Sequence, residues 1–321
     1  MISINKAIVE AAVKDSQTEI DEIHFKILTK LKKFKRKNNF QNPDVNKYID
    51  NVIAEFDKTN FITMALEDLE RIKNTIGQVP KLKEIFAGKK SETFLKDEIL
   101  AILDYKKKRS DFYPIYFAKI GIKACVYCNS QLTIVVEKKS VDNGESSEYI
   151  AKFQLDHYFP EDKYPHLSVA LFNLYPVCSS CNLAKRNNED FKFKLYENSF
   201  KKSDCKFELC SKSKAIFLTT RNSKDLKILF NDTVNSEYNN VFKIDEIYKT
   251  QYDIAEEIIL KSLTYNSAYR ESLFKEFGKH RINDGLINRF ILGNYTQEDE
   301  IHKRPFAKFM QDIGKETGLI K

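Results

Sequence analysis

The sequence predicts an α+β protein in which a small β-rich module lies between two mainly helical regions. Three observations lead to this prediction. Apolar residues recur at helical spacing before about residue 116, β-branched runs with two Cys-x-x-Cys pairs follow, and helical spacing returns after about residue 199. We therefore divide the chain into residues 1–116, 117–199 and 200–321.

The first region is predicted to be helical because its apolar residues form stripes. Ile20, Ile23, Ile27 and Leu31 share one helix face. Later stripes contain Val52, Phe56, Ile62, Leu66, Leu69, Ile72, Leu95, Ile99, Ile102 and Leu103. We expect these residues to form a core.

The net charge of +7 is a mild basic excess, which is compatible with a polyanionic partner. The basic runs Lys30–Lys37 and Lys106–Arg109 contribute to it, and we expect both runs to form solvated helix faces.

The middle region begins with two predicted strands, 131–137 and 149–155, on either side of an Asn143-Gly144 turn. The second strand leads into Asp156 and His157. Neighbouring residues of a regular strand point to opposite faces. The strand must therefore end or bend at this pair if both side chains serve one site.

Two cysteine pairs bracket this segment: Cys125-Val-Tyr-Cys128 and Cys178-Ser-Ser-Cys181. Four thiolates at this spacing suit one tetrahedral Zn²⁺, and they leave no coordination position open for water. The sequence therefore predicts a structural zinc. Cys205 and Cys210 are spaced too widely for such a site, and we interpret them as free thiols.

The residues between and after the cysteines suit phosphodiester hydrolysis. That reaction needs a base for water and a cation that offsets charge on the phosphate. A neutral His157 is suited to the first role near pH 7. Asp156 and the amide of Asn182, where a helix is predicted to begin, offer oxygen ligands for Mg²⁺ or Mn²⁺. An Asp-His pair alone is more often a structural hydrogen-bonded pair, so the flanking cysteines carry the interpretation.

Together these residues resemble the HNH endonucleases, which have the ββα-metal (His-Me finger) fold. The resemblance covers about residues 117–190 and rests on Cys125-x2-Cys128, Asp156-His157, Asn173 and Cys178-x2-Cys181-Asn182-x2-Lys185. It implies that His157 is the general base, Asp156 and Asn182 bind the catalytic ion, Asn173 braces the loop of His157, and Lys185 lies near a phosphate. Family members often carry His where this chain has Asn182.

A narrower resemblance is to HNH proteins encoded beside ATPases in bacterial anti-phage systems of the Septu or retron-associated type. It rests on the segments 156–160, 163–165, 173–174 and 300–305. It implies that the helical regions dock an ATPase partner.

Three further residues near the predicted site receive structural interpretations. His166 is expected to be a surface or loop-packing residue. Tyr158 and Phe159 are expected to pack the loop in preference to stacking on a nucleic-acid base.

No apolar stretch reaches the roughly 20 residues that a membrane-spanning helix needs. The first residues also lack the apolar core of a signal peptide. We therefore expect a cytoplasmic protein without a membrane partner.

The function predicted from the sequence is that of a metal-dependent DNA endonuclease. Two alternatives stay open: an HNH nuclease that cleaves RNA, tRNA included, and a zinc-stapled nucleic-acid-binding module without cleavage activity. A single site of this kind makes one nick, so a double-strand break would require a dimer or repeated events.

Overall fold

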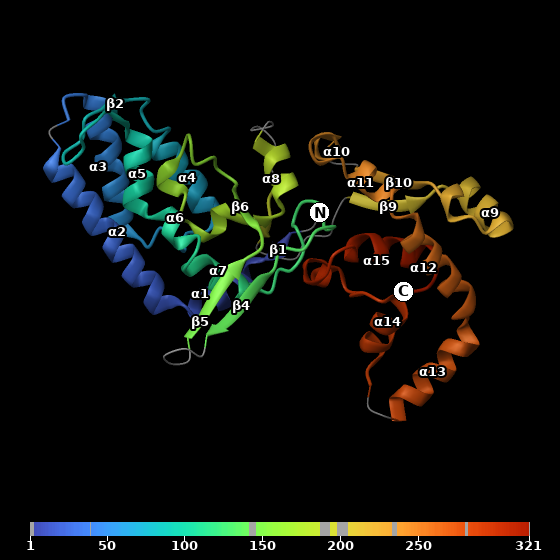
Figure 1. Ribbon diagram of the computed structural model, residues 1–321. Helices are drawn as coiled ribbons and strands as arrows, with labels where there is room; N and C mark the ends of the chain where they lie inside the picture. The colour runs from blue at the N-terminus through green and yellow to red at the C-terminus, as the bar shows by residue number, and fades with distance from the viewer. Residues whose placement is uncertain are drawn as a thin grey trace.

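Helices dominate the described part of the chain, and each sheet found there has two strands (Figure 1). The computed structural model describes residues 3–38, 40–140, 146–186, 193–197, 205–232, 236–279 and 282–320. Within these residues the protein is α+β, as the sequence predicts.

The N-terminal region packs its helices around the predicted apolar stripes. The helices are α1 (Lys6–Lys14), α2 (Gln17–Lys37), α3 (Pro43–Lys58), α4 (Leu66–Ile76), α5 (Leu95–Leu103), α6 (Tyr105–Lys108) and α7 (Phe112–Ile120). Of the first stripe, Ile20, Ile27 and Leu31 are buried and Ile23 is half-buried. Asn42 caps α3, because its side chain accepts a hydrogen bond from the amide of Asp44. The short strands β1 (Ile4–Asn5), β2 (Lys83–Glu84) and β3 (Thr93–Phe94) complete the region.

The strands of the middle region differ from the prediction in their bounds and pairing. β4 (Val135–Ser140) pairs antiparallel with β5 (Ser146–Ala151), and the predicted Asn143-Gly144 turn lies outside the described residues. The predicted second strand, 149–155, is in fact two strands, because β5 ends at Ala151 and β6 (Gln154–His157) begins after a bend. Residue alternation alone does not reveal this change of partner.

β6, β7 (Leu174–Val177) and α8 (Ser179–Arg186) follow one another as strand, strand and helix. β6 and β7 pair antiparallel, with Asp156 opposite Tyr175 and His157 opposite Leu174. β6 ends at His157, which agrees with the prediction that the strand ends or bends at the Asp-His pair. α8 begins at Ser179, three residues before the predicted start at Asn182, so Cys181 lies within the helix.

The C-terminal region contains more helices and one sheet that the sequence did not predict. The helices are α9 (Ser211–Thr220), α10 (Ser236–Phe242), α11 (Ile244–Lys249), α12 (Tyr252–Thr264), α13 (Ser267–Lys279), α14 (Asp284–Leu292) and α15 (Ala307–Glu316). The sheet pairs β9 (Cys205–Leu209) with β10 (Ile228–Asp232). Because α9 separates these strands, no short turn motif marks them in the sequence. The remaining strand, β8 (Tyr196–Glu197), pairs parallel with β1.

Buried apolar residues from all three regions belong to one continuous core. Figure 1 shows the N-terminal and C-terminal helices on opposite sides of the β6–β7–α8 segment. α7 runs through the predicted boundary at residue 116, so this boundary does not coincide with the end of an element.

The basic runs are solvated with one exception. The lysines and arginine of 30–37 are exposed, as are Lys106, Lys107 and Arg109. Lys108 is instead buried, and its ammonium group donates to the carbonyl of Leu103 at 2.6 Å. Burial lowers the pKa of Lys108 to about 8.

Among the helices of the described residues, none combines the length and the apolar character needed to cross a membrane.

The turn that carries the first cysteine pair is held by the C-terminal region. Asn129, which follows the pair, is fully buried and has a left-handed backbone with a φ of 54°. Its side-chain amide donates to the carbonyl of Ile301 at 3.0 Å and accepts from the amide of Lys308 at 3.1 Å. Its carbonyl accepts from the amide of Phe306 at 2.6 Å. Asn tolerates this backbone conformation better than most residues.

We expect Asn129→Ala to lower the free energy of unfolding by about 3 kcal/mol. The substitution leaves two buried backbone groups without a hydrogen-bond partner and strains the left-handed backbone. Chemical denaturation in the presence of Zn²⁺ measures this loss. Asn129→Gly, which removes only the side-chain bonds, should be about 1 kcal/mol more stable than the Ala variant. A loss of unfolding free energy below about 1 kcal/mol for Asn129→Ala would contradict the proposed stabilising role of Asn129.

Candidate metal centre and catalytic cavity

The two cysteine pairs converge on one point. The sulfur atoms of Cys125, Cys128, Cys178 and Cys181 all lie within 4.8 Å of one another, and none forms a disulfide. The first pair lies in the turn after α7, and the second lies at the junction of β7 and α8. The predicted grouping of the four cysteines is thus confirmed.

This geometry fits a tetrahedral zinc. A Zn–S bond of about 2.3 Å places neighbouring sulfurs about 3.8 Å apart, and the Sγ atoms of Cys128 and Cys178 are 3.9 Å apart. The amide of Cys178 donates to Sγ of Cys125 at 3.3 Å, and the hydroxyl of Ser130 donates to Sγ of Cys128 at 3.2 Å. Donors aimed at sulfur stabilise thiolates. Burial raises the pKa of the Cys125 thiol, so its ionisation requires a nearby cation.

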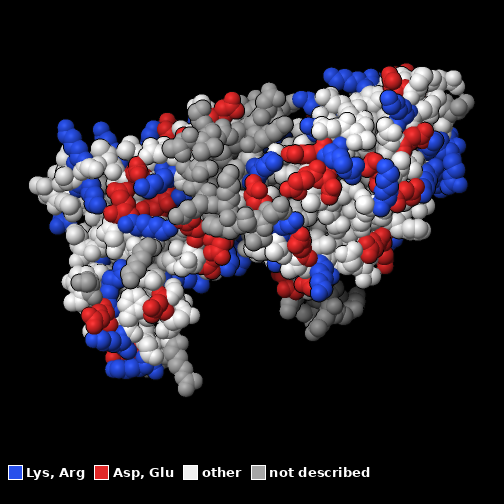
Figure 2. Space-filling view, turned by 180° about the vertical axis from the view of Figure 1, so that it is seen from behind, with Lys and Arg blue, Asp and Glu red and all other residues white. Residues whose placement is uncertain are grey.

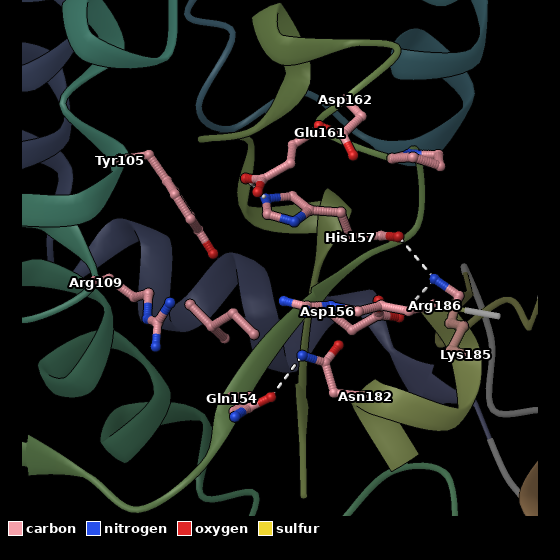
Figure 3. A pocket seen from close by; sticks show the side chains of 12 residues that line it. Tyr105, Arg109, Gln154, Asp156, His157, Glu161, Asp162, Asn182, Lys185 and Arg186 are labelled. Atoms are coloured by element: carbon pink, nitrogen blue, oxygen red, sulfur yellow. Dashed lines mark hydrogen bonds and ion pairs between the residues drawn. The ribbon is translucent and has the colours of Figure 1, made fainter. Parts of the chain in front are cut away.

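A cavity of about 590 Å³ lies along β6 and is also lined by residues of α8, the helix that contains Cys181 (Figure 3). Its walls contain Tyr105, Arg109, Gln154, Leu155, Asp156, His157, Pro160, Glu161, Asp162, Asn182, Lys185 and Arg186. Among the described strands β6 pairs only with β7. Because the cavity follows the unpaired edge and end of the strand, side chains from both faces reach it. Asp156 and His157 therefore share the cavity although they point to opposite faces.

Asp156 is held by two donors on one oxygen. Its Oδ2 accepts from the hydroxyl of Tyr127 at 2.6 Å and from the ammonium group of Lys185 at 2.6 Å. Its other carboxylate oxygen, Oδ1, makes no hydrogen bond to the part of the chain that the structure describes. The carboxylate thus has one oxygen fixed by the protein and one available to a ligand in the cavity.

The imidazole of His157 has a defined tautomer. Its Nε2 lies 3.1 Å from the carbonyl oxygen of Ser168. A carbonyl can only accept, so Nε2 carries the proton and Nδ1 is left as the basic nitrogen. The ring of Tyr105 packs beside it with centroids 5.0 Å apart. Burial lowers the pKa of His157, although Glu161 and Asp156 partly oppose the shift. The histidine is therefore a neutral base near pH 7.

Asn173 braces the loop that follows His157. Its side chain is fully buried at the end of a 3₁₀ turn, Leu171–Asn173. Its Oδ1 accepts from the amide of Phe159 at 2.7 Å, and its Nδ2 donates to the carbonyl of Leu167 at 2.9 Å. Asn173 therefore contacts the loop backbone and not the cavity, which is the position that the resemblance implies.

α8 brings Asn182 and Lys185 to the cavity, because residues three apart on a helix are neighbours. Nδ2 of Asn182 donates to the side chain of Gln154 at 2.6 Å, which directs its Oδ1 away from Gln154 (Figure 3). Lys185 is buried, and it donates to Asp156 and to the carbonyl of His157 at 2.8 Å. These contacts give Lys185 a positioning role, whereas its contact with a phosphate stays a prediction.

Several residues of this site are not predicted by the sequence. Arg109 belongs to a run that the sequence predicts to be a solvated helix face, yet it lines the cavity from the end of α6, and Arg186 lines it from the end of α8. Glu161 lies four residues after His157, with its carboxylate 3.9 Å from Nε2. Tyr127 lies between the cysteines of the first pair, and no sequence motif indicates its contact with Asp156. Only the spacing from His157 to Glu161 could have been noticed in advance.

The remaining assignments concern residues outside the cavity. Tyr158 and Phe159 are buried, which agrees with loop packing. His166 is fully buried, so the surface alternative is wrong; its Nδ1 bonds the hydroxyl of Tyr48 at 2.9 Å, and burial lowers its pKa to about 3. Cys205 and Cys210 are free thiols, as expected.

No protein-family model, curated protein or solved structure matches the chain.

We expect the purified protein to contain about one Zn²⁺ per chain, measured by elemental analysis, because the four sulfurs fit one tetrahedral ion. Cys128→Ser should reduce the bound zinc to less than about half an ion and lower the thermal unfolding midpoint, because metal binding contributes to folding. Cys210→Ser is the matched control and should keep its zinc. Full zinc content in the Cys128 variant would show that the cluster is not the metal site.

Proposed function

We propose that this protein is a metal-dependent endonuclease of the HNH type that hydrolyses phosphodiester bonds in DNA. The observation that carries the proposal is one cavity in which a neutral histidine, a carboxylate and a carboxamide meet at the end of a strand–strand–helix segment. A zinc ion held by the four-cysteine cluster would stabilise this segment.

His157 is the proposed general base. Its Nδ1 would accept a proton from water, while its Nε2–H stays bonded to the carbonyl of Ser168. Protonation would give an imidazolium, and the carboxylate of Glu161, 3.9 Å from Nε2, is placed to stabilise that charge. Asn173 keeps the loop after His157 in place and so limits the movement of the base.

Asp156 and Asn182 fit a hard divalent ion, because each has a side-chain oxygen without a hydrogen-bond donor among the described residues. A bound Mg²⁺ or Mn²⁺ would offset negative charge on the phosphate and the leaving oxygen. Lys185 and Tyr127 fix the carboxylate that holds it.

Arg109 and Arg186 are the residues best placed to bind the phosphate backbone. Both are exposed, line the cavity, and form no ion pair with another described residue. Guanidinium groups bind phosphate through paired N–H donors. On the face shown in Figure 2, Lys and Arg are interspersed with Asp and Glu. Contacts of the two cavity arginines with the phosphate backbone would be independent of base sequence.

The proposed ATPase partner rests on the narrower resemblance. Exposed apolar side chains can mark a surface that binds a partner. Both helical regions have them, for example Phe25 on α2 and Phe290 on α14. We propose the helical regions as the docking surfaces for the ATPase of such a system.

We expect the protein to nick supercoiled plasmid DNA in the presence of Mg²⁺ or Mn²⁺ and to stop when EDTA is added. His157→Ala should lower the cleavage rate about 10²- to 10⁴-fold, because it removes the general base. His24→Ala, a histidine of α2, is the control and should cleave at the wild-type rate. Equal nicking by the wild type and His157→Ala would refute the mechanism.

The same assay separates the alternatives when single-stranded DNA and total RNA are included. Cleavage of RNA alone would favour the RNA nuclease. DNA binding by both wild type and His157→Ala without cleavage by either would favour a zinc-stapled binding module.

A further inference from the structure

We propose that Tyr127 is a positioning residue that orients Asp156 for metal binding and thereby makes the catalytic ion site depend on the C-terminal region. The inference rests on the proposed function, because it concerns the ion that Asp156 would bind. It assigns a role to a residue between the two cysteines of the first pair, outside the group of residues that carries the resemblance.

The hydroxyl of Tyr127 contacts the carboxylate of Asp156 directly. It donates to Oδ2 of Asp156 at 2.6 Å, from a side chain that is fully buried. Lys185 donates to the same oxygen at 2.6 Å. With both donors on Oδ2, the carboxylate has one rotational setting, and Oδ1 is the oxygen presented to the cavity. Groups that bond a metal ligand in this way set its orientation and affinity.

The ring and backbone of Tyr127 both contact α10. The ring stacks on Phe242 of α10, with centroids 4.5 Å apart and planes inclined by 20°. The carbonyl of Tyr127 accepts a hydrogen bond from the hydroxyl of Tyr238, also on α10. One residue therefore contacts α10 on one side and Asp156 on the other.

The neighbouring contacts strengthen this connection. The hydroxyl of Tyr248, on α11, donates to the carbonyl of Cys128 at 2.8 Å. The cysteine cluster anchors Cys125 and Cys128 on either side of Tyr127. Tyr127 thus has little freedom to move unless α10, α11 or the cluster moves as well. A displacement of α10 would be transmitted to the carboxylate.

The test compares Mn²⁺ binding, measured by electron paramagnetic resonance of free Mn²⁺, in zinc-loaded wild type and variants. Tyr127→Phe removes only the hydroxyl and should weaken Mn²⁺ binding about tenfold, the lower end for such groups because Lys185 stays in place. Phe242→Leu leaves Asp156 untouched and should weaken binding in the same direction. Tyr196→Phe is the matched control: it removes a buried hydroxyl that bonds the carbonyl of Leu174 at 2.8 Å, and it should bind Mn²⁺ like the wild type.

Zinc content and thermal unfolding establish that each variant is folded. Mn²⁺ affinity of Tyr127→Phe within twofold of the wild type would overturn the positioning role. An unchanged affinity in Phe242→Leu would overturn the dependence on α10. Asp156→Asn separates this inference from the proposed function: wild-type binding that survives Asp156→Asn would reject the ion site itself.

Discussion

Burying four thiolates side by side is unfavourable unless a cation neutralises their charge, and the candidate site contains the four cysteines at metal-binding distance. The cluster joins a turn after α7 to the start of α8, with Cys128 and Cys178 separated by 50 positions in the sequence. Closing such a loop costs conformational entropy, which a metal bond can offset. The closed loop then contains β6, β7 and the segment braced by Asn173. Asp156 and His157, at the end of β6, therefore lie within the closed loop.

Local spacing allowed some of the site to be predicted from the sequence. The short spacing of a Cys-x-x-Cys pair brings its two sulfur atoms close together. The prediction of a four-cysteine cluster therefore required only that the two pairs lie side by side in the fold. The position of Asn173 beside the loop of His157 is instead what the resemblance to the HNH endonucleases implies. The chain segment between Ala151 and Gln154 could not be interpreted in this way. Its bend depends on which strand each half pairs with, and that is a tertiary property.

Other features could not be predicted because the residues that contact one another lie far apart in the sequence. Arg109 belongs to a basic run whose members differ in burial: Arg109 lines the cavity, whereas the adjacent Lys108 is buried. The β9–β10 sheet encloses α9, so the strands do not form a local hairpin. The contact between Tyr127 and Asp156 spans 29 residues, and no periodicity links the two. Long-range contacts of this kind are decided by the packed core as a whole.

During protein synthesis, the turn that contains the first cysteine pair is made before the C-terminal residues that bind it. Asn129 bonds Ile301 and Lys308, which follow it by 172 and 179 residues. Chains grow from the N-terminus at roughly 5–20 residues per second, so these partners emerge seconds after the turn itself. Until then, a ribosome-bound chain has its cysteines, Asp156 and His157 but lacks the contacts that fix the turn. The cell would therefore hold few incomplete chains with an assembled cavity, which suits a protein whose proposed activity damages nucleic acid.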